Sequence, residues 1–140
     1  MSDLNKSDVD SVCGELSRAF QGVLSWKWDD RFETVLAEFG VASKDKVRAI
    51  LERYFSSTWD RSNVGTAPEI VRSIDSDFGG LWPEQWLFTS DPNQDALIFC
   101  TWWPWSDGKS TSIRIGLSCR KLSESETDEK VEQFKKSFGV

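Results

Sequence analysis

The stretch that decides the fold is ALIFCTWWPWSDGKSTSIRIGLSCR, residues 96–120. Near its centre, Asp107-Gly108 is a two-residue signal for a type I′ hairpin turn. If positions 106 and 109 flank that turn, the numbers of two paired residues add up to 215. Trp102 then faces Ile113, and further apolar residues of both arms share that face at every second position. This agreement between turn and alternation predicts an antiparallel pair of strands.

The opposite face of this hairpin is apolar as well. The same pairing places Leu97, Phe99 and Trp103 there, with Gly116 opposite Phe99. A glycine at that position leaves room for a ring to lie flat or for a backbone to approach. Left uncovered, this face would mark an interface or a groove. We favour the alternative that helices cover both faces, because aromatic residues are most often core residues.

The rest of the chain predicts a single α+β domain, residues 1–140. A strand over 85–89 would complete a three-stranded antiparallel meander with strands 96–103 and 111–120. About four helices are expected before the meander, and a C-terminal helix is expected over 124–138. A chain of this length usually forms one domain.

The N-terminal helices are predicted from apolar residues at helical spacing. Residues 9–24 carry one clear apolar stripe. In the second helix Phe32, Val35 and Phe39 share a face, and Gly40 is placed as the C′ residue. A third helix follows directly, so the two would form a helical hairpin. A DNA-reading helix-turn-helix has the same spacing, but the net charge of −6 disfavours it.

Capping signals predict where two further helices begin. The sequence TAPE at 66–69 has the pattern of a capping box with proline at N1, and would open the fourth helix. Ser123 with Glu126 has the same pattern before the last helix. Between the third and fourth helices, residues 56–65 are predicted to form a loop.

The charge of the chain bears on its partners and location. A nucleic-acid binder needs Lys and Arg for phosphate contacts, and an anionic membrane would repel a chain of net charge −6. The first residues lack the apolar segment of a secretory signal, and no apolar run reaches the length of a membrane span. We therefore expect a cytoplasmic protein whose partner is a basic protein, with no binding to nucleic acid or membrane.

The residue types argue against an enzyme. The sequence contains no histidine, which removes the commonest general base and metal ligand. Its three cysteines lack metal-site spacing, and the hairpin register holds Cys100 and Cys119 too far apart for a disulfide. The segment from Asp91 to Asp95 begins like a calcium loop but lacks the required glycine and final glutamate. Carboxylate pairs of glycosidase type are better explained as surface and turn charges. We predict no catalytic residue, metal or cofactor.

The best candidate for function is a tryptophan-rich stretch. Five of the eight tryptophans lie within residues 73–108, together with six carboxylates and no Lys or Arg. Indole faces beside unpaired carboxylates attract cations and basic partners. The first hypothesis is a protein-interaction module of adaptor, inhibitor, chaperone or toxin-neutralising type, anchored by tryptophans. Its candidate binding residues are Trp86, Phe99, Trp103, Trp105, Asp91, Asp95 and Asp107.

Two alternatives use the same residues. The indoles could hold a cationic or planar small molecule beside a carboxylate. The aromatic face could instead pair with a second copy in a two-fold homodimer. The predicted register already divides the tryptophans, because Trp102 lies on the packed face and Trp103 on the opposite one.

Overall fold

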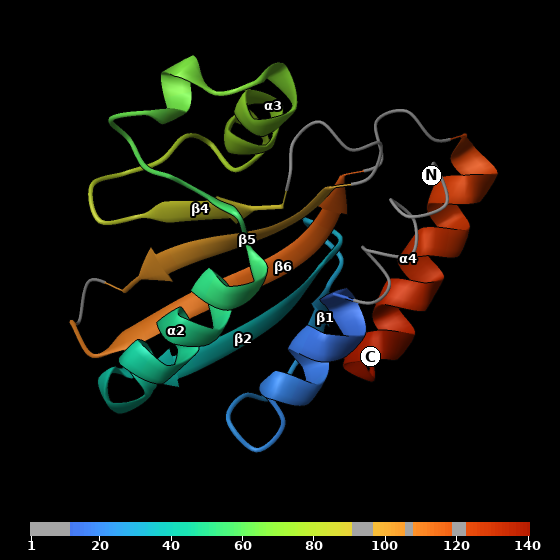
Figure 1. Ribbon diagram of the computed structural model, residues 1–140, viewed down its shortest axis with the longest axis horizontal. Helices are drawn as coiled ribbons and strands as arrows, with labels where there is room; N and C mark the ends of the chain where they lie inside the picture. Colours follow the sequence, from blue (N-terminus) through green and yellow to red (C-terminus); the bar gives the residue numbers. More distant parts are fainter. Residues whose placement is uncertain (1–11, 91–96, 106–107, 119–122) are drawn as a thin grey trace.

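The computed structural model describes residues 12–90, 97–105, 108–118 and 123–140. Its centre is a six-stranded antiparallel sheet with the order β1-β2-β6-β5-β4-β3 (Figure 1). The strands are β1 (Lys27–Asp29), β2 (Thr34–Gly40), β3 (Ser57–Trp59), β4 (Trp86–Thr89), β5 (Leu97–Pro104) and β6 (Ser110–Ser118). Residues 12–19 are helical, followed along the chain by η1 (Val41–Ser43), α2 (Lys44–Tyr54), η2 (Val64–Thr66), α3 (Glu69–Asp77) and α4 (Glu124–Phe138).

This architecture corrects the predicted three-stranded meander behind about four N-terminal helices. The three predicted strands exist as β4, β5 and β6, but they form only the middle of the sheet. β2 and β1 extend it beyond β6, and β3 extends it beyond β4. Within the described ranges, three α-helices rather than four precede β4.

The segment predicted as the second helix is a β-hairpin. Val35, Ala37 and Phe39 are buried along one face of β2, where Val35 pairs with Ile115 and Ala37 with Ile113. Val35 and Phe39 are four residues apart, a spacing that places them on one face of either a helix or a strand. Pairing with β6, which lies far along the chain, decides between the two. The predicted helical hairpin, and with it the helix-turn-helix alternative, is therefore wrong.

The predicted helix starts are partly right. The box at Ser123 is confirmed, because the Glu126 backbone N–H donates to the Ser123 side chain at 3.2 Å. The predicted box at 66–69 is wrong, since Pro68 is the N-cap residue of α3 and no side chain caps that helix. The predicted loop over 56–65 contains β3 and the start of η2.

The register of the central hairpin is confirmed. Every Cα pair between β5 and β6 adds up to 215, including Trp102 with Ile113. Gly108 has a φ of 69°, the left-handed conformation that a tight hairpin turn requires. Asp107 and Cys119 lie outside the described residues, so the type of turn and the separation of the cysteines remain predictions.

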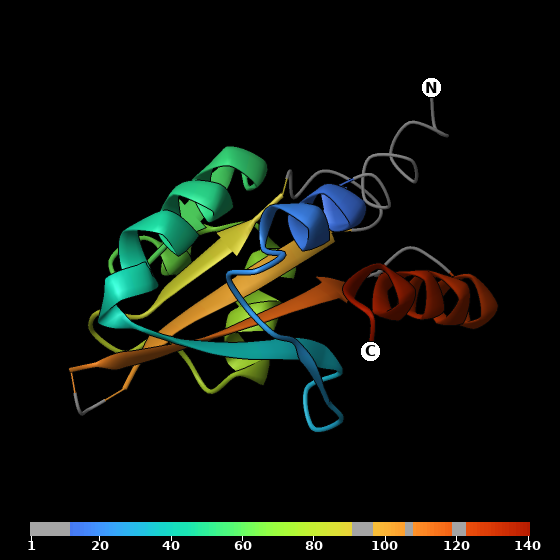
Figure 2. The same ribbon diagram turned by 90° about the horizontal axis from the view of Figure 1, so that it is seen from below.

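Helices cover both faces of the sheet, as the favoured alternative predicted. Figure 2 shows α2 and the first helix on one face and α3 on the other. The first face is buried around Trp102 and Phe88, and the second packs Leu97 and Phe99 against α3 and η2. α4 lies beyond the end of the sheet at which β6 finishes (Figure 1). In the described segments, no helix combines the length and the apolar character needed to cross a membrane.

Gly116 allows the Phe99 ring to pack closely against β6 on the second face. A Cβ at this position would lie 2.7 Å from Cζ of Phe99 and 2.8 Å from Cγ2 of Thr34. The predicted role of this glycine is thus confirmed, because the Phe99 ring occupies the space that a side chain would fill. The backbone of β6 and the ring opposite it form one wall of the site described next.

Candidate functional site

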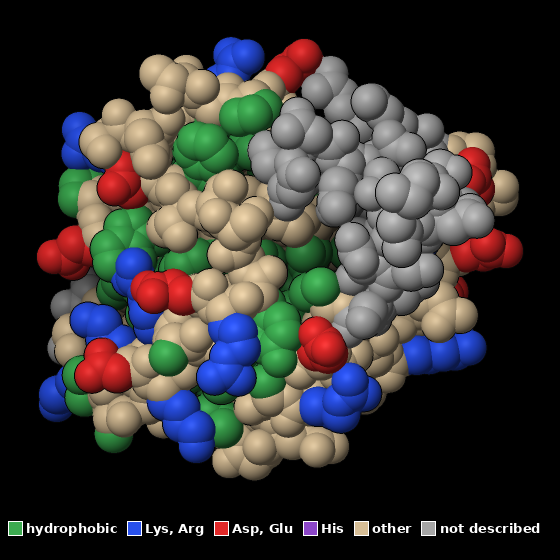
Figure 3. Space-filling model, in the orientation of Figure 1, with side chains coloured by type: hydrophobic (Ala, Val, Ile, Leu, Met, Phe, Trp, Pro, Cys, Tyr) green, Lys and Arg blue, Asp and Glu red, His purple; other side chains and the backbone are tan. Residues whose placement is uncertain are grey.

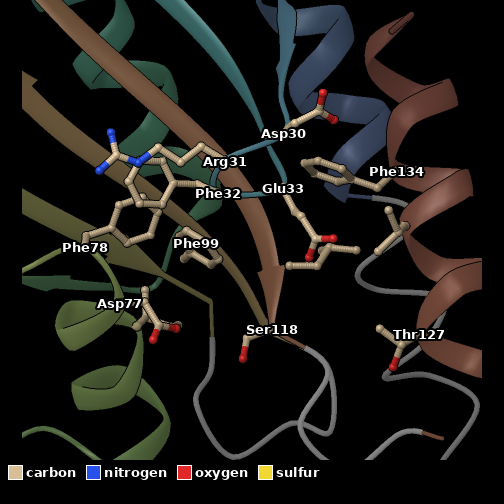
Figure 4. A pocket seen from close by; sticks show the side chains of 13 residues that line it. Asp30, Arg31, Phe32, Glu33, Asp77, Phe78, Phe99, Ser118, Thr127 and Phe134 are labelled. Carbon is tan, nitrogen blue, oxygen red and sulfur yellow. The ribbon is translucent and has the colours of Figure 1, made fainter. Parts of the chain in front are cut away.

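Two pockets lie at opposite ends of the sheet. The larger has a volume of about 710 Å³ and lies where β6 ends and β2 begins. We call it the acidic pocket; α3, α4, the β1–β2 turn and the ends of the central strands line it (Figure 4). Its lining residues are Asp30, Arg31, Phe32, Glu33, Ile74, Asp77, Phe78, Phe99, Leu117, Ser118, Thr127, Val131 and Phe134.

The acidic pocket carries carboxylates that nothing in the described structure neutralises. Asp30, Glu33 and Asp77 are exposed, and within the described ranges none of their side chains forms a hydrogen bond or an ion pair. Arg31 is the only basic residue among the described lining residues, and its guanidinium lies over the Phe32 ring at 5.0 Å. The Glu33 side chain points into the pocket (Figure 4). The pocket therefore presents negative charge above an aromatic wall.

That wall is a cluster of aromatic rings on the second sheet face. Phe32, from the β1–β2 turn, stacks on Phe78 at 4.5 Å between centroids. Phe78 in turn meets Trp103 and Phe99 edge-on, at 5.4 Å and 5.8 Å. These rings cover the part of the second face beyond α3, so Phe99 is buried and Trp103 is half-buried. These ring contacts hold the β1–β2 turn, which carries Asp30 and Glu33, against the sheet.

An ion pair fixes the same turn from the side of β6. The Arg114 Nε donates to Asp29 Oδ2 at 2.9 Å, and its guanidinium lies over the rings of Trp103 and Phe32 at 4.7 Å and 5.3 Å. Burial raises the pKa of Asp29, but hydrogen bonds from Arg114 and from the Arg31 backbone outweigh it. The pKa of Asp29 consequently lies below its ordinary value. This carboxylate is engaged internally, unlike those of the pocket.

The smaller pocket, about 310 Å³, lies at the other end of the sheet. We call it the tryptophan pocket; it lies where β5 ends, β6 begins and α2 starts. Trp105 and Val41 are 45% and 65% exposed there. The full lining is Val41, Lys44, Glu84, Trp86, Trp102, Pro104, Trp105, Gly108, Lys109, Ser110 and Thr111.

Two indoles of the tryptophan pocket are held in place. The Trp105 Nε1 donates to the Ser112 hydroxyl at 2.6 Å. The Arg48 guanidinium stacks on the Trp86 ring at 3.4 Å, and the Arg48 Nε donates to Glu52 at 2.7 Å. Rings with fixed orientation lose little entropy when they contact a partner.

Each pocket contains a glutamate with a strained backbone. Glu33 has a φ of 52° and Glu84 a φ of 73°, and they are the two non-glycine residues with positive φ among those described. Such conformations cost about 1–2 kcal/mol and tend to occur at functional sites.

The predicted site residues are divided between these places. Trp86 and Trp105 come together in the tryptophan pocket, although Trp86 lies on the sheet face of Trp102 and not on that of Trp103. Phe99 lines the acidic pocket, and Trp103 packs beside it. The steering carboxylates Asp91, Asp95 and Asp107 lie outside the described residues.

The carboxylates of the acidic pocket were missed by the sequence analysis. Asp30 and Glu33 lie at the start of the segment that was predicted as the second helix, and Asp77 lies in the predicted fourth helix. Asp29-Asp30, a pair of turn-favouring residues between two short apolar stretches, is a hairpin signal that could have revealed them.

Two observations on the described residues concern metal binding and thiol chemistry. No group of three or more Cys, Asp and Glu side chains within them is placed to hold a metal ion. Burial raises the pKa of the Cys100 thiol well above its ordinary value, which keeps this thiol protonated and unreactive.

Comparison with known proteins adds no assignment. No family model, no curated protein and no solved structure matches the chain.

Proposed function

We propose that this protein is an interaction module that binds a basic segment of a protein partner at the acidic pocket. The observation that carries the proposal is the set of carboxylates of Asp30, Glu33 and Asp77, which have no ion-pair partner among the described residues, around a space of about 710 Å³. Carboxylates without internal partners attract a cationic partner and need no broken ion pair to receive it. The net charge of −6 acts in the same direction at longer range.

The aromatic wall supports the same occupant. Phe32 and Phe78 present ring surface at the pocket, and an arginine or lysine side chain can lie along rings while its head meets a carboxylate. The bound form needs no metal, cofactor or catalytic group. The proposal keeps a cytoplasmic location and a non-enzymatic role, as expected from the sequence.

A small cationic ligand is the second candidate, because the volume lies within the usual range of ligand pockets. Titration of ¹⁵N-labelled protein separates the two. One arm adds a short peptide of alternating arginine and leucine, and the other adds spermidine. A protein-binding pocket responds to the peptide with amide shifts at Glu33 and Asp77 that saturate. A ligand pocket responds at least as strongly to spermidine.

The decisive variant neutralises the pocket without changing its shape. Asp30→Asn/Glu33→Gln/Asp77→Asn should weaken peptide binding by about tenfold or more at low salt, since three charge interactions are lost. The matched control, Glu15→Gln/Glu38→Gln/Glu132→Gln, removes three exposed carboxylates outside the pocket. Equal weakening by both triple variants would mean that only net charge matters, and the proposed site would be wrong.

A further inference from the structure

The tryptophan pocket has the features of a binding site with the opposite charge preference. Its exposed apolar residues, Val41 and Trp105, lie beside the half-buried Trp86. Large exposed apolar residues that gather in one place mark interaction sites. Tryptophan is also among the residues most enriched in binding hot spots.

Among the described residues that line this pocket, basic side chains outnumber acidic ones. Lys44 and Lys109 line it, against Glu84. α2, which begins at the pocket, carries the sequence KDKVRAILERY, with four basic and two acidic residues. Figure 3 shows several Lys and Arg side chains over α2, at the lower left of that view, with some Asp and Glu side chains between them and hydrophobic surface around them. This basic character contrasts with the acidic pocket at the other end of the sheet.

The size of the pocket restricts its occupant. A volume of about 310 Å³ is at the lower limit for small-molecule sites and suits one large apolar side chain. The indole of Trp105 is held by Ser112 and that of Trp86 by Arg48, so the pocket is formed before a partner arrives. Its occupant should therefore be an apolar side chain with carboxylates on either side of it.

We infer that the tryptophan pocket binds an apolar side chain within an acidic segment of a partner protein. Charge complementarity with Lys44 and Lys109 selects this occupant over a basic segment. The site goes beyond the proposed function, because it shares no lining residue with the acidic pocket.

The test follows the indole Nε1–H signals of Trp86 and Trp105 in ¹⁵N-labelled full-length protein, assigned with Trp→Phe variants. The probe is acetyl-Glu-Glu-Leu-Phe-Glu-Glu-amide, compared with its glutamine and lysine analogues and with an oligothymidylate. We expect saturable shifts of both signals with the glutamate peptide. It should bind about fivefold more tightly than the glutamine peptide at low salt, and less so at high salt.

Variants at an exposed position separate binding from folding. Val41 is 65% exposed, so its replacement leaves the core intact. Val41→Glu should weaken binding of the glutamate peptide by about fivefold, and Val41→Lys should strengthen it similarly. Trp105→Ala should abolish the shift of the Trp86 signal. Glu33→Gln, in the acidic pocket, should change nothing in this assay.

Several results would overturn the inference. One is the absence of indole shifts up to millimolar peptide, and another is equal binding of the glutamate and lysine peptides. Shifts caused by oligothymidylate alone would assign the pocket to nucleic acid instead. Indole shifts that follow protein concentration without peptide, with a dimer in sedimentation, would assign it to a second copy. None of these results would bear on the acidic pocket.

Discussion

The two pockets are built from similar residues and differ in how the fold assembles them. Both combine aromatic rings with a glutamate at positive φ. The acidic pocket joins the β1–β2 turn, α3, α4 and the end of β6, which lie far apart along the chain. The tryptophan pocket is formed mainly by the β5–β6 hairpin and the segments before β4 and α2. The comparison teaches that tryptophans clustered in sequence need not share a site, and that dispersed carboxylates can.

The largest expected effect on stability distinguishes Trp102 from Trp105, which line the same pocket. Trp102 is 1% exposed and packs against Phe39, Trp86 and Phe88. Trp102→Ala should lower the free energy of unfolding by about 3–5 kcal/mol. Trp105→Ala should lower it by about 1 kcal/mol or less, because that side chain is 45% exposed. Urea unfolding measures both. A similar loss for both would make Trp105 a core residue and remove it from the binding surface.

A substitution at Gly116 should lower stability by a smaller amount, and it should disturb the acidic pocket but not the tryptophan pocket. Gly116→Ala should destabilise by about 1–3 kcal/mol, because the new Cβ meets the Phe99 ring and Thr34. Displacement of Phe99 should alter amide signals around the acidic pocket and leave the indole signals of Trp86 and Trp105 unchanged. Gly65→Ala is the matched control, since nothing lies within 4 Å of its Cβ. Equal destabilisation by both substitutions would contradict the steric explanation.

The two arginines that stack on aromatic rings, Arg114 and Arg48, should contribute differently to the free energy of unfolding. Arg114→Gln removes a largely buried ion pair with Asp29 and should cost about 1–2 kcal/mol at neutral pH. Arg48→Gln removes a more exposed pair with Glu52 in one helix, and should cost about 0.5 kcal/mol.

The Arg114 effect should also depend on pH. The pKa of Asp29 is lower in the folded than in the unfolded protein, so the pair stabilises fully above about pH 4. This contribution is lost as the pH falls through the folded pKa. The free energies of unfolding of wild type and Arg114→Gln, measured at several pH values, should therefore differ less as the pH is lowered. A difference independent of pH would point to packing alone.

The smallest effects concern the strained glutamates, one in each pocket. Glu33→Gly and Glu84→Gly should each raise stability by about 0.5–1 kcal/mol, because glycine adopts positive φ without steric cost. Glu33→Gly should weaken binding of the arginine–leucine peptide, whereas Glu84→Gly should leave that binding unaffected. Glu38→Gly, in β2, is the control and should destabilise. Thermal unfolding measures all three, and loss of stability at Glu33 would show that its backbone is not strained.

Sequence reasoning found the parts of the fold that depend on neighbours along the chain. The β5–β6 register was predictable because a turn signal and a two-residue alternation agree over a short distance. The box of Ser123 and Glu126 was predictable for the same reason. Trp86 and Trp105 were proposed as binding residues from the sequence, but the sequence did not predict that they line one pocket together with Lys44 and Lys109.

The chain by itself thus determined the central hairpin, the helices α2 and α4, and the close packing at Gly116. Only the tertiary structure decided that residues 27–40 pair as strands. The spacing of Val35 and Phe39 fits a helix as well as a strand, and pairing of β2 with β6 decides between them. That pairing forms the turn with Asp30 and Glu33, and so creates the acidic pocket. The physical reason is that local patterns restrict the backbone of a segment, whereas a pocket depends on which distant segments bury their apolar faces together.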